Sequence, residues 1–357
     1  RYFALQKTDQ AISSVILIWI SLGKSLYSFL MKEGNMDLDR LIGQQALVSQ
    51  LKTIIEKNII GHAYAFTGPE GIGKRTFALA FAKGLLCSGN KSESCECLSC
   101  RIFKENTNPD FYEVVSEKAS IGVDSIREMQ NDVANRPSYG NRKVYFIDGA
   151  EKMTTQAQNC LLKTLEEPPE YTIILLSVTS FEALLPTIQS RSVNLRMNTY
   201  SEDEMKKILC SILDIPVNEL EFILKFSRGV PGNAIHMIEE GLVRDLRTQI
   251  FSLLEKRDNM NAVEDLRKSL IDNKQEITTA LDIIISVFRD CLMQKQGMEY
   301  RLINSDKKDI IKSIAKLNSK SVLLDKIDAL EKMRYNFKSN INYQLGIDVL
   351  LLEVQEV

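Results

Sequence analysis

A glycine-rich stretch that ends in a lysine is the first part of this sequence whose residue types and spacing could do chemistry. Gly68, Gly71 and Gly73 are followed directly by Lys74, after an apolar run at 63–66 and before an apolar helical pattern. Glycines let backbone N–H groups converge on a phosphate, the helix N-terminus adds its positive end, and the lysine can reach the outer phosphates. The spacing therefore predicts a phosphate-binding loop between a strand and a helix.

This loop departs from the usual pattern at the position that would hold a metal. In G-x-x-x-x-G-K-[ST] the last residue gives a hydroxyl to Mg²⁺, and this sequence has Arg75 there. Thr76 carries a hydroxyl, but one residue along a helix is a rotation of roughly 100°, so its side chain should point elsewhere. We therefore expect a loop derived from a nucleotide-hydrolysing protein and no longer suited to hydrolysis.

A cluster of cysteines forms a second candidate site. Four of the seven cysteines lie within residues 87–100, namely Cys87, Cys95, Cys97 and Cys100. Four thiolates can complete a tetrahedral Zn²⁺ site, which would be structural because no position stays open for water. We predict a structural zinc here. Reduced thiols are the alternative, because the single residue between Cys95 and Cys97 is a tighter gap than usual. Cys160, Cys210 and Cys291 lie in apolar helical patterns and are expected in the core.

An acidic residue follows the apolar run at 144–147. Asp148 stands where a hydrolysing enzyme of this class keeps the carboxylate that holds the cation, although it could also simply cap the next turn. Such enzymes usually continue with a glutamate that orients water. The next residue here is Gly149, and Glu151 lies further along. The carboxylate that activates water is therefore expected to be missing.

An arginine after the fourth apolar run could act outside its own subunit. Ser190 and Arg191 follow the run at 173–178 and a short helix-like stretch. An arginine in that place could reach a neighbour's nucleotide and stabilise the charge that develops there, which is worth roughly 10³–10⁵ in rate where such residues have been measured. We predict that Arg191 has this role.

Alternating strand and helix patterns must position these residues. Apolar runs at 63–66, 111–115, 144–147 and 173–178 are separated by helical patterns, and after Arg196 only helical patterns follow. This alternation is typical of an α/β domain with a doubly wound parallel sheet. The expected divisions are an α/β domain over 36–196 with the cysteine module at 87–100, a helical lid over 197–243 and an all-α domain over 244–357.

Composition and the first residues restrict the function classes. The chain has 357 residues and a net charge of −2, so no global basic field indicates nucleic acid. The apolar run at 11–22 is shorter than the ~20 residues that a membrane span needs. We expect residues 1–35 to be an extension outside the fold and the protein to lack a membrane segment. A helical tail or anchor is the alternative.

Several longer motifs resemble the delta-prime family of subunits of the bacterial DNA polymerase III clamp loader, a branch of the AAA+ proteins. They lie at 62–64, 108–111, 122–127, 157–169 and 190–191, together with the four cysteines. The run Leu-Leu-Lys-Thr-Leu-Glu-Glu-Pro-Pro at 161–169 is the most specific of them. The resemblance covers residues 36–196 closely and the helical remainder only in its architecture.

The resemblance implies a place in a larger assembly. It implies a P-loop AAA+ domain, a small lid and a C-terminal collar through which the chain joins gamma/tau and delta subunits. That assembly loads the sliding clamp on primed DNA and belongs to the polymerase III holoenzyme, a cytoplasmic nucleotidyltransferase complex at the replisome. Delta-prime members are described as a rigid stator, whose Ser-Arg element, here Ser190 and Arg191, reaches the ATP site of the adjacent motor subunit.

Three departures favour delta-prime over the motor subunits. The motors keep a hydroxyl, a glutamate and a lid arginine where this chain has Arg75, Gly149 and, at the expected lid position, Gly232. Metal, water and transition-state charge each lose a partner, so we expect no intrinsic ATPase activity. Binding of ATP or ADP without hydrolysis stays open. The residues for it would be Gly68, Gly71, Gly73, Lys74, Thr76 and Asp148.

Two other functions stay open from the sequence. One is an active AAA+ clamp-loader ATPase of the gamma/tau type, which would use Thr76 or Glu151 in shifted roles. The other is a zinc-containing DNA-binding module, which the net charge of −2 disfavours.

Overall fold

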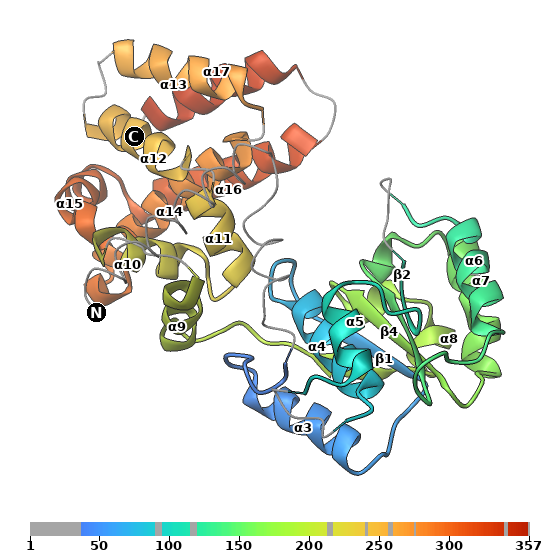
Figure 1. Cartoon of the computed structure of the whole chain (residues 1–357). Coiled ribbons are helices and arrows are strands. Elements are labelled where there is room, and N and C mark those ends of the chain that lie inside the picture. Colours follow the sequence, from blue (N-terminus) through green and yellow to red (C-terminus); the bar gives the residue numbers. More distant parts are fainter. Residues whose placement is uncertain are drawn as a thin grey trace, which may run out of the picture. The chain divides into compact units, whose positions relative to one another are not determined.

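The protein is described from a computed structural model, in which it divides into two compact units. They are Arg1–Asp214 with Gly229–Ile235, and Ile215–Arg228 with His236–Val357. The structure describes residues 37–89, 95–114, 120–212, 217–239, 242–255, 260–274, 276–338 and 342–355, so the expected N-terminal extension lies outside it. The three-part division with bounds at 196 and 243 stays a prediction. Figure 1 shows the elements of both units.

A parallel sheet of five strands is the centre of the first unit. The strands are β1 (Ala63–Thr67), β2 (Phe111–Val114), β3 (Lys143–Ile147), β4 (Thr172–Val178) and β5 (Val193–Arg196). Their order is β2-β3-β4-β1-β5, and every neighbouring pair is parallel. Every residue of β1, β3 and β4 is buried, which explains their continuous apolar runs.

The sequence analysis missed β5. Three of its four residues are exposed, and it pairs with β1 alone at the edge of the sheet. A short edge strand of this kind does not need an apolar run, because one of its sides faces solvent.

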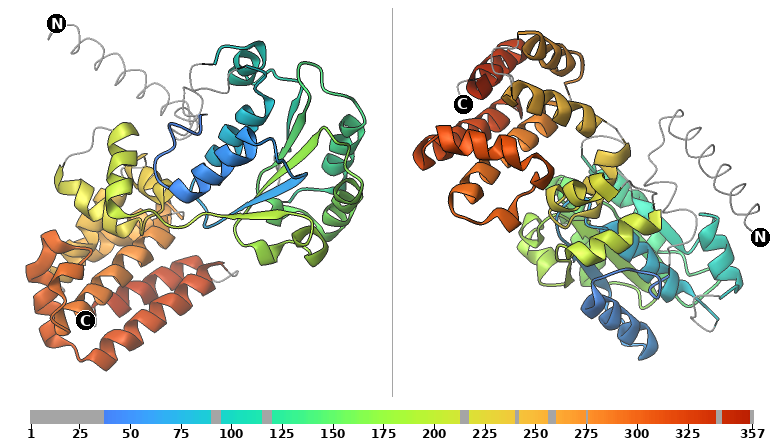
Figure 2. Two further views of the ribbon diagram at one scale, coloured as in Figure 1. Left: turned by 90° about the horizontal axis from the view of Figure 1, so that it is seen from below. Right: turned by 90° about the vertical axis from the view of Figure 1, so that its left-hand side faces the viewer.

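Helices cover both faces of this sheet (Figure 2). The helices of this unit are, in sequence order, α3 (Gln45–Glu56), α4 (Lys74–Leu86), α5 (Leu98–Lys104), α6 (Val123–Val133), α7 (Thr155–Glu166), α8 (Pro186–Gln189) and α9 (Glu202–Ile212). Helix α4 packs against β1, β3 and β4, and α6 packs against β2 and α7. Alternate residues of β1 serve the two faces: Tyr64 meets Phe81 of α4 edge to face at 5.2 Å, whereas Ala65 belongs to the core under α6 and α7. The strand ends and α4 therefore converge on the phosphate loop, which we define as residues 68–74.

The second unit is helical throughout its described residues. It contains α10 (Val217–Phe226), α12 (Leu242–Glu255), α13 (Met260–Asp272), α14 (Glu276–Lys295), α15 (Lys308–Leu317), α16 (Lys320–Lys338) and α17 (Tyr343–Gln355). Helix α11 (Pro231–Glu239) begins in the first unit and ends in the second. Helix α14 is buried over most of its length and packs against α12, α15 and α16. The expected α/β fold followed by helices is confirmed.

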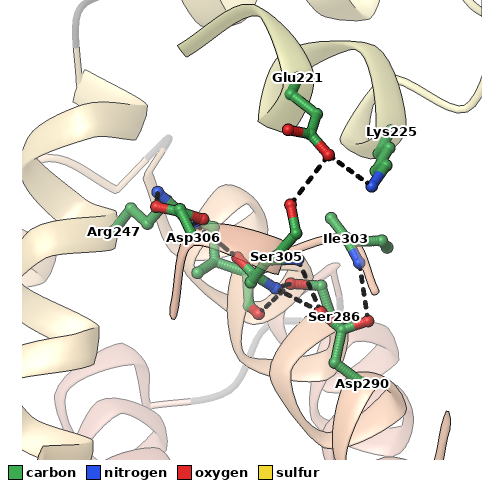
Figure 3. Close-up of polar contacts among 10 residues, drawn as sticks. Glu221, Lys225, Arg247, Ser286, Asp290, Ile303, Ser305 and Asp306 are labelled. Atoms are coloured by element: carbon green, nitrogen blue, oxygen red, sulfur yellow. Dashed lines mark hydrogen bonds and ion pairs between the residues drawn. The ribbon is translucent and has the colours of Figure 1, made fainter. Parts of the chain in front are cut away.

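A polar network fixes the connection from α14 to α15 (Figure 3). The carboxylate of Asp290, which is fully buried, accepts hydrogen bonds from the backbone N–H groups of Ile303 at 3.0 Å and Asn304 at 2.7 Å. Arg247 of α12 donates to Asn304 at 3.2 Å and forms an ion pair with Asp306. The irregular segment before α15 is thus tied to two helices.

None of the described helices is both long enough and apolar enough to cross a lipid bilayer.

Candidate functional site

The predicted phosphate loop forms between β1 and α4. Gly71 and Gly73 have φ angles of +77° and +104°, a left-handed conformation that glycine adopts without steric cost. Lys74 is the first residue of α4, and its Nζ donates to the carbonyls of Gly68 at 2.7 Å and Pro69 at 2.9 Å. Burial lowers the pKa of Lys74, while nearby carboxylates, Glu151 first among them, oppose that shift.

Arg75 makes the most extensive contacts of the site. Its guanidinium donates to both carboxylate oxygens of Glu113 on β2, with Nη2 to Oε2 at 2.9 Å, and its Nη1 also donates to Oδ2 of Asp148 at 3.2 Å. The ring of Phe146 lies 5.8 Å from Cζ. Burial opposes the charge of Arg75, but the hydrogen bonds and charge of Glu113, followed by those of Asp148, raise its pKa. The arginine that replaces the hydroxyl is therefore anchored on two carboxylates.

Asp148 follows β3 and is engaged on both oxygens. Its Oδ1 accepts a hydrogen bond from the hydroxyl of Ser177 at 2.6 Å, and Oδ2 accepts the bond from Arg75. The same Ser177 oxygen accepts from the backbone N–H of Gly149 at 2.8 Å. The acid predicted from the sequence is thus in the expected place, at the end of a central strand, with a serine from β4 and an arginine from α4 as partners.

Thr76 and Glu151, the two residues considered for shifted roles, lie close in sequence to Arg75 and Asp148. Thr76 is in the first turn of α4, and Glu151 is in a 3-10 turn, Ala150–Lys152. One carboxylate oxygen of Glu151, Oε2, is buried without a hydrogen-bond partner.

The start of α11 touches the phosphate loop backbone to backbone. The N–H of Gly232 donates to the carbonyl of Gly71 at 2.9 Å. A Cβ at position 232 would lie 2.5 Å from Cα and 2.9 Å from the carbonyl oxygen of Gly71. An arginine, the residue that the resemblance implies for a motor subunit, could not fit at this position unless the helix moved away from the loop.

Ser190 and Arg191 form a separate feature at the end of α8. Arg191 donates from Nη1 to the carbonyl of Thr187 at 3.1 Å and to the hydroxyl of Ser190 at 3.3 Å. Its Nη2 forms an ion pair with Glu166, the last residue of α7, at 3.1 Å. The side chain remains 37% exposed, so the guanidinium is accessible to a partner.

The four predicted cysteine ligands come together. Their Sγ atoms all lie within 4.8 Å of one another, with Cys87 and Cys95 at 3.5 Å and Cys87 and Cys97 at 4.0 Å. Tetrahedral zinc with Zn–S bonds of about 2.3 Å separates its sulfurs by about 3.8 Å, so this donor set fits the metal. A Cβ on Gly89 would lie 2.5 Å from Sγ of Cys95, so the chain passes too close to the cluster for a side chain there.

The thiols of the cluster differ in acidity. Burial opposes ionisation of Cys97, yet hydrogen bonds from Ser88 and Cys100 lower the pKa of its thiol to about 6. Burial and the neighbouring Cys97 and Cys87 raise the pKa of Cys100. A metal ion binds cysteine as the thiolate, so binding at this cluster would release the proton that Cys100 holds more tightly than usual.

Comparison with known proteins identifies the family. The model described as "DNA polymerase III, delta subunit" matches residues 43–201, and "DNA polymerase III, delta subunit, C terminal" matches residues 245–356. The DNA polymerase III subunit delta' of Bacillus subtilis is 27% identical over 319 residues, which are 88% of this chain and 96% of that protein. The chain belongs to the delta-prime family of clamp-loader subunits.

Other relatives lie in the same family and its neighbours. The delta' subunit of Pseudomonas aeruginosa is 36% identical over 218 residues, covering 60% of this chain and 65% of that protein. The tau/gamma subunit of Haemophilus influenzae is 31% identical over 238 residues, 65% of this chain and 33% of its own length. A solved gamma subunit-related protein of Thermotoga maritima has a TM-score of 0.46 at 18% identity and covers 86% of this chain and 99% of its own.

The delta-prime family assignment confirms the resemblance drawn from the motifs. The parallel sheet flanked by helices, followed by a helical region, confirms the expected fold class. Sequence reasoning missed Glu113, Ser177 and Glu166 as partners of the site residues. Glu113 carried a visible signal, a lone acid inside the strand Phe111–Val114. Ser177 carried none, because serine in a strand is common. Glu166 lies in the run at 161–169, but nothing in that run indicated Arg191 as its partner.

Proposed function

We propose that this chain is a non-hydrolysing stator of the DNA polymerase III clamp loader, acting when the sliding clamp is loaded on primed DNA during replication. The observation that carries the proposal is the guanidinium of Arg75 on the carboxylate of Asp148. The guanidinium neutralises the carboxylate that would hold the cation, and its positive charge disfavours a second cation beside it, whereas hydrolysis of ATP depends on that cation. Membership of the delta-prime family supports the same conclusion.

The active contribution of the chain would be Arg191, donated in trans to the ATP site of a neighbouring gamma/tau subunit. Its partners in the chain alone, Glu166 and Ser190, hold the guanidinium at the end of α8 by contacts that a triphosphate could replace. Arginine suits this role because its planar fork binds phosphate oxygens in pairs and keeps its charge at any physiological pH.

The helical second unit would supply the contacts with gamma/tau and delta subunits. Leu345, Val349 and Leu352 of α17 are 60%, 40% and 57% exposed. Their spacing of four and three residues places them on one face of the helix, where an exposed apolar stripe suits a partner surface. The assembly would work in the cytoplasm at the replisome.

Zinc is the metal we assign to the four cysteines, in a structural role. Four sulfur donors at tetrahedral spacing match zinc better than the oxygen-preferring Mg²⁺ or Ca²⁺. The ion would join the end of α4 to the start of α5, since Cys87 follows one helix and Cys97 precedes the other.

An active ATPase of the gamma/tau type is the second candidate. It is favoured by the intact glycines, by Lys74 and by the buried, unpartnered Oε2 of Glu151, which could orient a water molecule. In that case the pair between Arg75 and Asp148 would have to open when Mg-ATP binds.

Steady-state ATPase measurements separate the two candidates. The purified chain should release no phosphate from Mg-ATP. A clamp loader reconstituted with Arg191→Ala should fall to about a tenth of the wild-type rate or less. Arg127→Ala is the matched control, because Arg127 is an exposed arginine whose ion pair within the described part of the chain is with Asp124 of its own helix. Turnover by the chain alone would favour the second candidate. A normal rate with Arg191→Ala would contradict the proposed action of Arg191 on the neighbouring subunit.

A further inference from the structure

The residues around the phosphate loop do not fit the divalent cation that loops of this kind normally use. The hydroxyl ligand is replaced by Arg75, and both oxygens of Asp148 already accept hydrogen bonds, from Arg75 at 3.2 Å and from Ser177 at 2.6 Å. Mg²⁺ requires near-octahedral oxygen ligands at about 2.0–2.1 Å. A guanidinium held at this position pairs with the carboxylate that such an ion would need, and its positive charge repels the ion.

The charges of the site are nevertheless arranged as they would be around a metal. Glu113 and Asp148 bring two carboxylates from neighbouring strands, and the fixed cation between them is Arg75. Arg75 is the second residue of α4 and follows Lys74 directly. Two cationic side chains therefore lie at the N-terminus of α4, whose backbone N–H groups face the loop. Phe146 lies beside the guanidinium and restricts its movement.

Lys74 shows where an anion would bind. Its Nζ is satisfied by the loop's own carbonyls of Gly68 and Pro69, at 2.7 and 2.9 Å. Both acceptors are neutral backbone carbonyls. Charged phosphate oxygens form stronger hydrogen bonds with an ammonium group than neutral carbonyls do. A phosphate chain could therefore take over these bonds while the anchor of Arg75 on its carboxylates stays in place.

We propose that Arg75 is a resident cation that replaces Mg²⁺, so that this loop binds a polyphosphate group without any divalent metal. The ligand class is a pyrophosphate unit, either free or as part of ADP or ATP. The inference rests on the proposed absence of hydrolysis in this chain and concerns the chain's own loop. It is independent of whether Arg191 acts on a neighbour.

Isothermal titration of the full chain with pyrophosphate, ADP and ATP, each in excess Mg²⁺ and in EDTA, tests the proposal. The wild-type Kd should agree within about threefold between the two conditions for at least one of these ligands. Arg75→Ser restores the hydroxyl, so its binding should weaken at least about tenfold in EDTA and recover in Mg²⁺. Arg75→Lys keeps the charge and should bind in EDTA, and Arg127→Ser is the control for removal of an arginine.

The outcomes are decisive in both directions. Binding of pyrophosphate in EDTA supports the proposal with a free polyphosphate, and binding of ADP or ATP alone supports it with a nucleotide. Wild-type binding that requires Mg²⁺, or no binding of any of the three ligands in EDTA, overturns it. If Arg75→Ser fails to fold, Arg75→Lys and the wild-type comparison still decide. ATP turnover by the wild-type chain would instead contradict the proposed stator.

Discussion

The side chain at position 75 lies one residue beyond the lysine of the phosphate loop, and its contacts reach two strands of the sheet. It donates to Glu113 on β2 and to Asp148 after β3. A serine or threonine there would be too short for either contact, so Glu113 and Asp148 would lose the guanidinium and could share a cation instead, with Asp148 still bonded to Ser177. The identity of one residue therefore separates a metal-binding loop from the closed arrangement seen here.

At the same scale, the cysteine cluster predicts a metal content. Cys97→Ser removes one of four sulfur ligands, so the purified protein should lose about one zinc per chain, as measured by mass spectrometry, and should unfold at a lower temperature. Cys210→Ser is the control, because Cys210 is exposed and lies outside the cluster. Unchanged zinc content in Cys97→Ser would rule out this residue as a ligand.

A second residue-scale prediction concerns the contact between α11 and the phosphate loop. Gly232→Ala places a Cβ 2.5 Å from Cα of Gly71, and backbone cannot move aside cheaply. Overpacking of this kind costs about 1–3 kcal/mol in the free energy of unfolding, measured in urea. Gly122→Ala, where a Cβ meets nothing within 4 Å, should leave the value within about 0.5 kcal/mol. Equal stability of the two variants would disprove the close contact.

At the scale of elements, ion pairs and buried acceptors determine how helices connect. Arg247 of α12 lies over the ring of Phe222 on α10 at 4.0 Å while its Nη1 donates to Asp306 at 2.9 Å. Asp290 holds the segment before α15 by two backbone N–H groups. These contacts tie the irregular segment before α15 to α12 and α14 (Figure 3).

The Arg247–Asp306 pair predicts a pH dependence. Burial would raise the pKa of Asp306, but the hydrogen bonds and charge of Arg247 lower it below its ordinary value. A depressed pKa contributes stability that is present above the unfolded-state value of about 3.9 and is lost as pH falls through the folded-state pKa. The difference in unfolding free energy between wild type and Asp306→Asn should thus shrink below about pH 4.

Chemical denaturation between pH 2 and 7 measures this difference. In an Arg247→Ala background the change Asp306→Asn should have a clearly smaller effect of this sign, because the largest of the causes that lower the pKa of Asp306 is gone, while a backbone hydrogen bond and the charge of Lys307 remain. A pH dependence that persists undiminished without Arg247 would assign the shift to another group.

At the scale of the whole molecule, the proposed contact of the exposed apolar stripe of α17 with other subunits gives a prediction. Leu345→Ser with Leu352→Ser should leave the chain folded, since both side chains are more than half exposed, but should reduce its co-purification with gamma/tau and delta subunits at least about tenfold. Met260→Ser is the control, because Met260 on α13 is 73% exposed and outside the stripe. Full incorporation of the double variant would place the subunit contacts elsewhere.

Much of this protein followed from its sequence, because the relevant signals are local. Glycine spacing before Lys74, continuous apolar runs for β1, β3 and β4, and four cysteines within residues 87–100 report backbone conformation, burial and ligand chemistry over short stretches. The conformation and chemistry of such short stretches depend mainly on their own residues. The family, the fold class and the candidate residues could therefore be predicted from the sequence.

Tertiary structure alone decided which of these residues meet. Arg75 finds Glu113 at 38 positions and Asp148 at 73 positions along the chain, and Arg191 rests on Glu166 of another helix. The edge strand β5 was likewise missed, since a short amphipathic segment has no apolar run. The expectation that Cys160, Cys210 and Cys291 lie in the core is right for Cys291, but Cys160 is only partly buried and Cys210 is exposed, because a helical pattern does not show which face is covered. Pairing across a sheet depends on how the strands are ordered, and no single stretch of sequence contains that order.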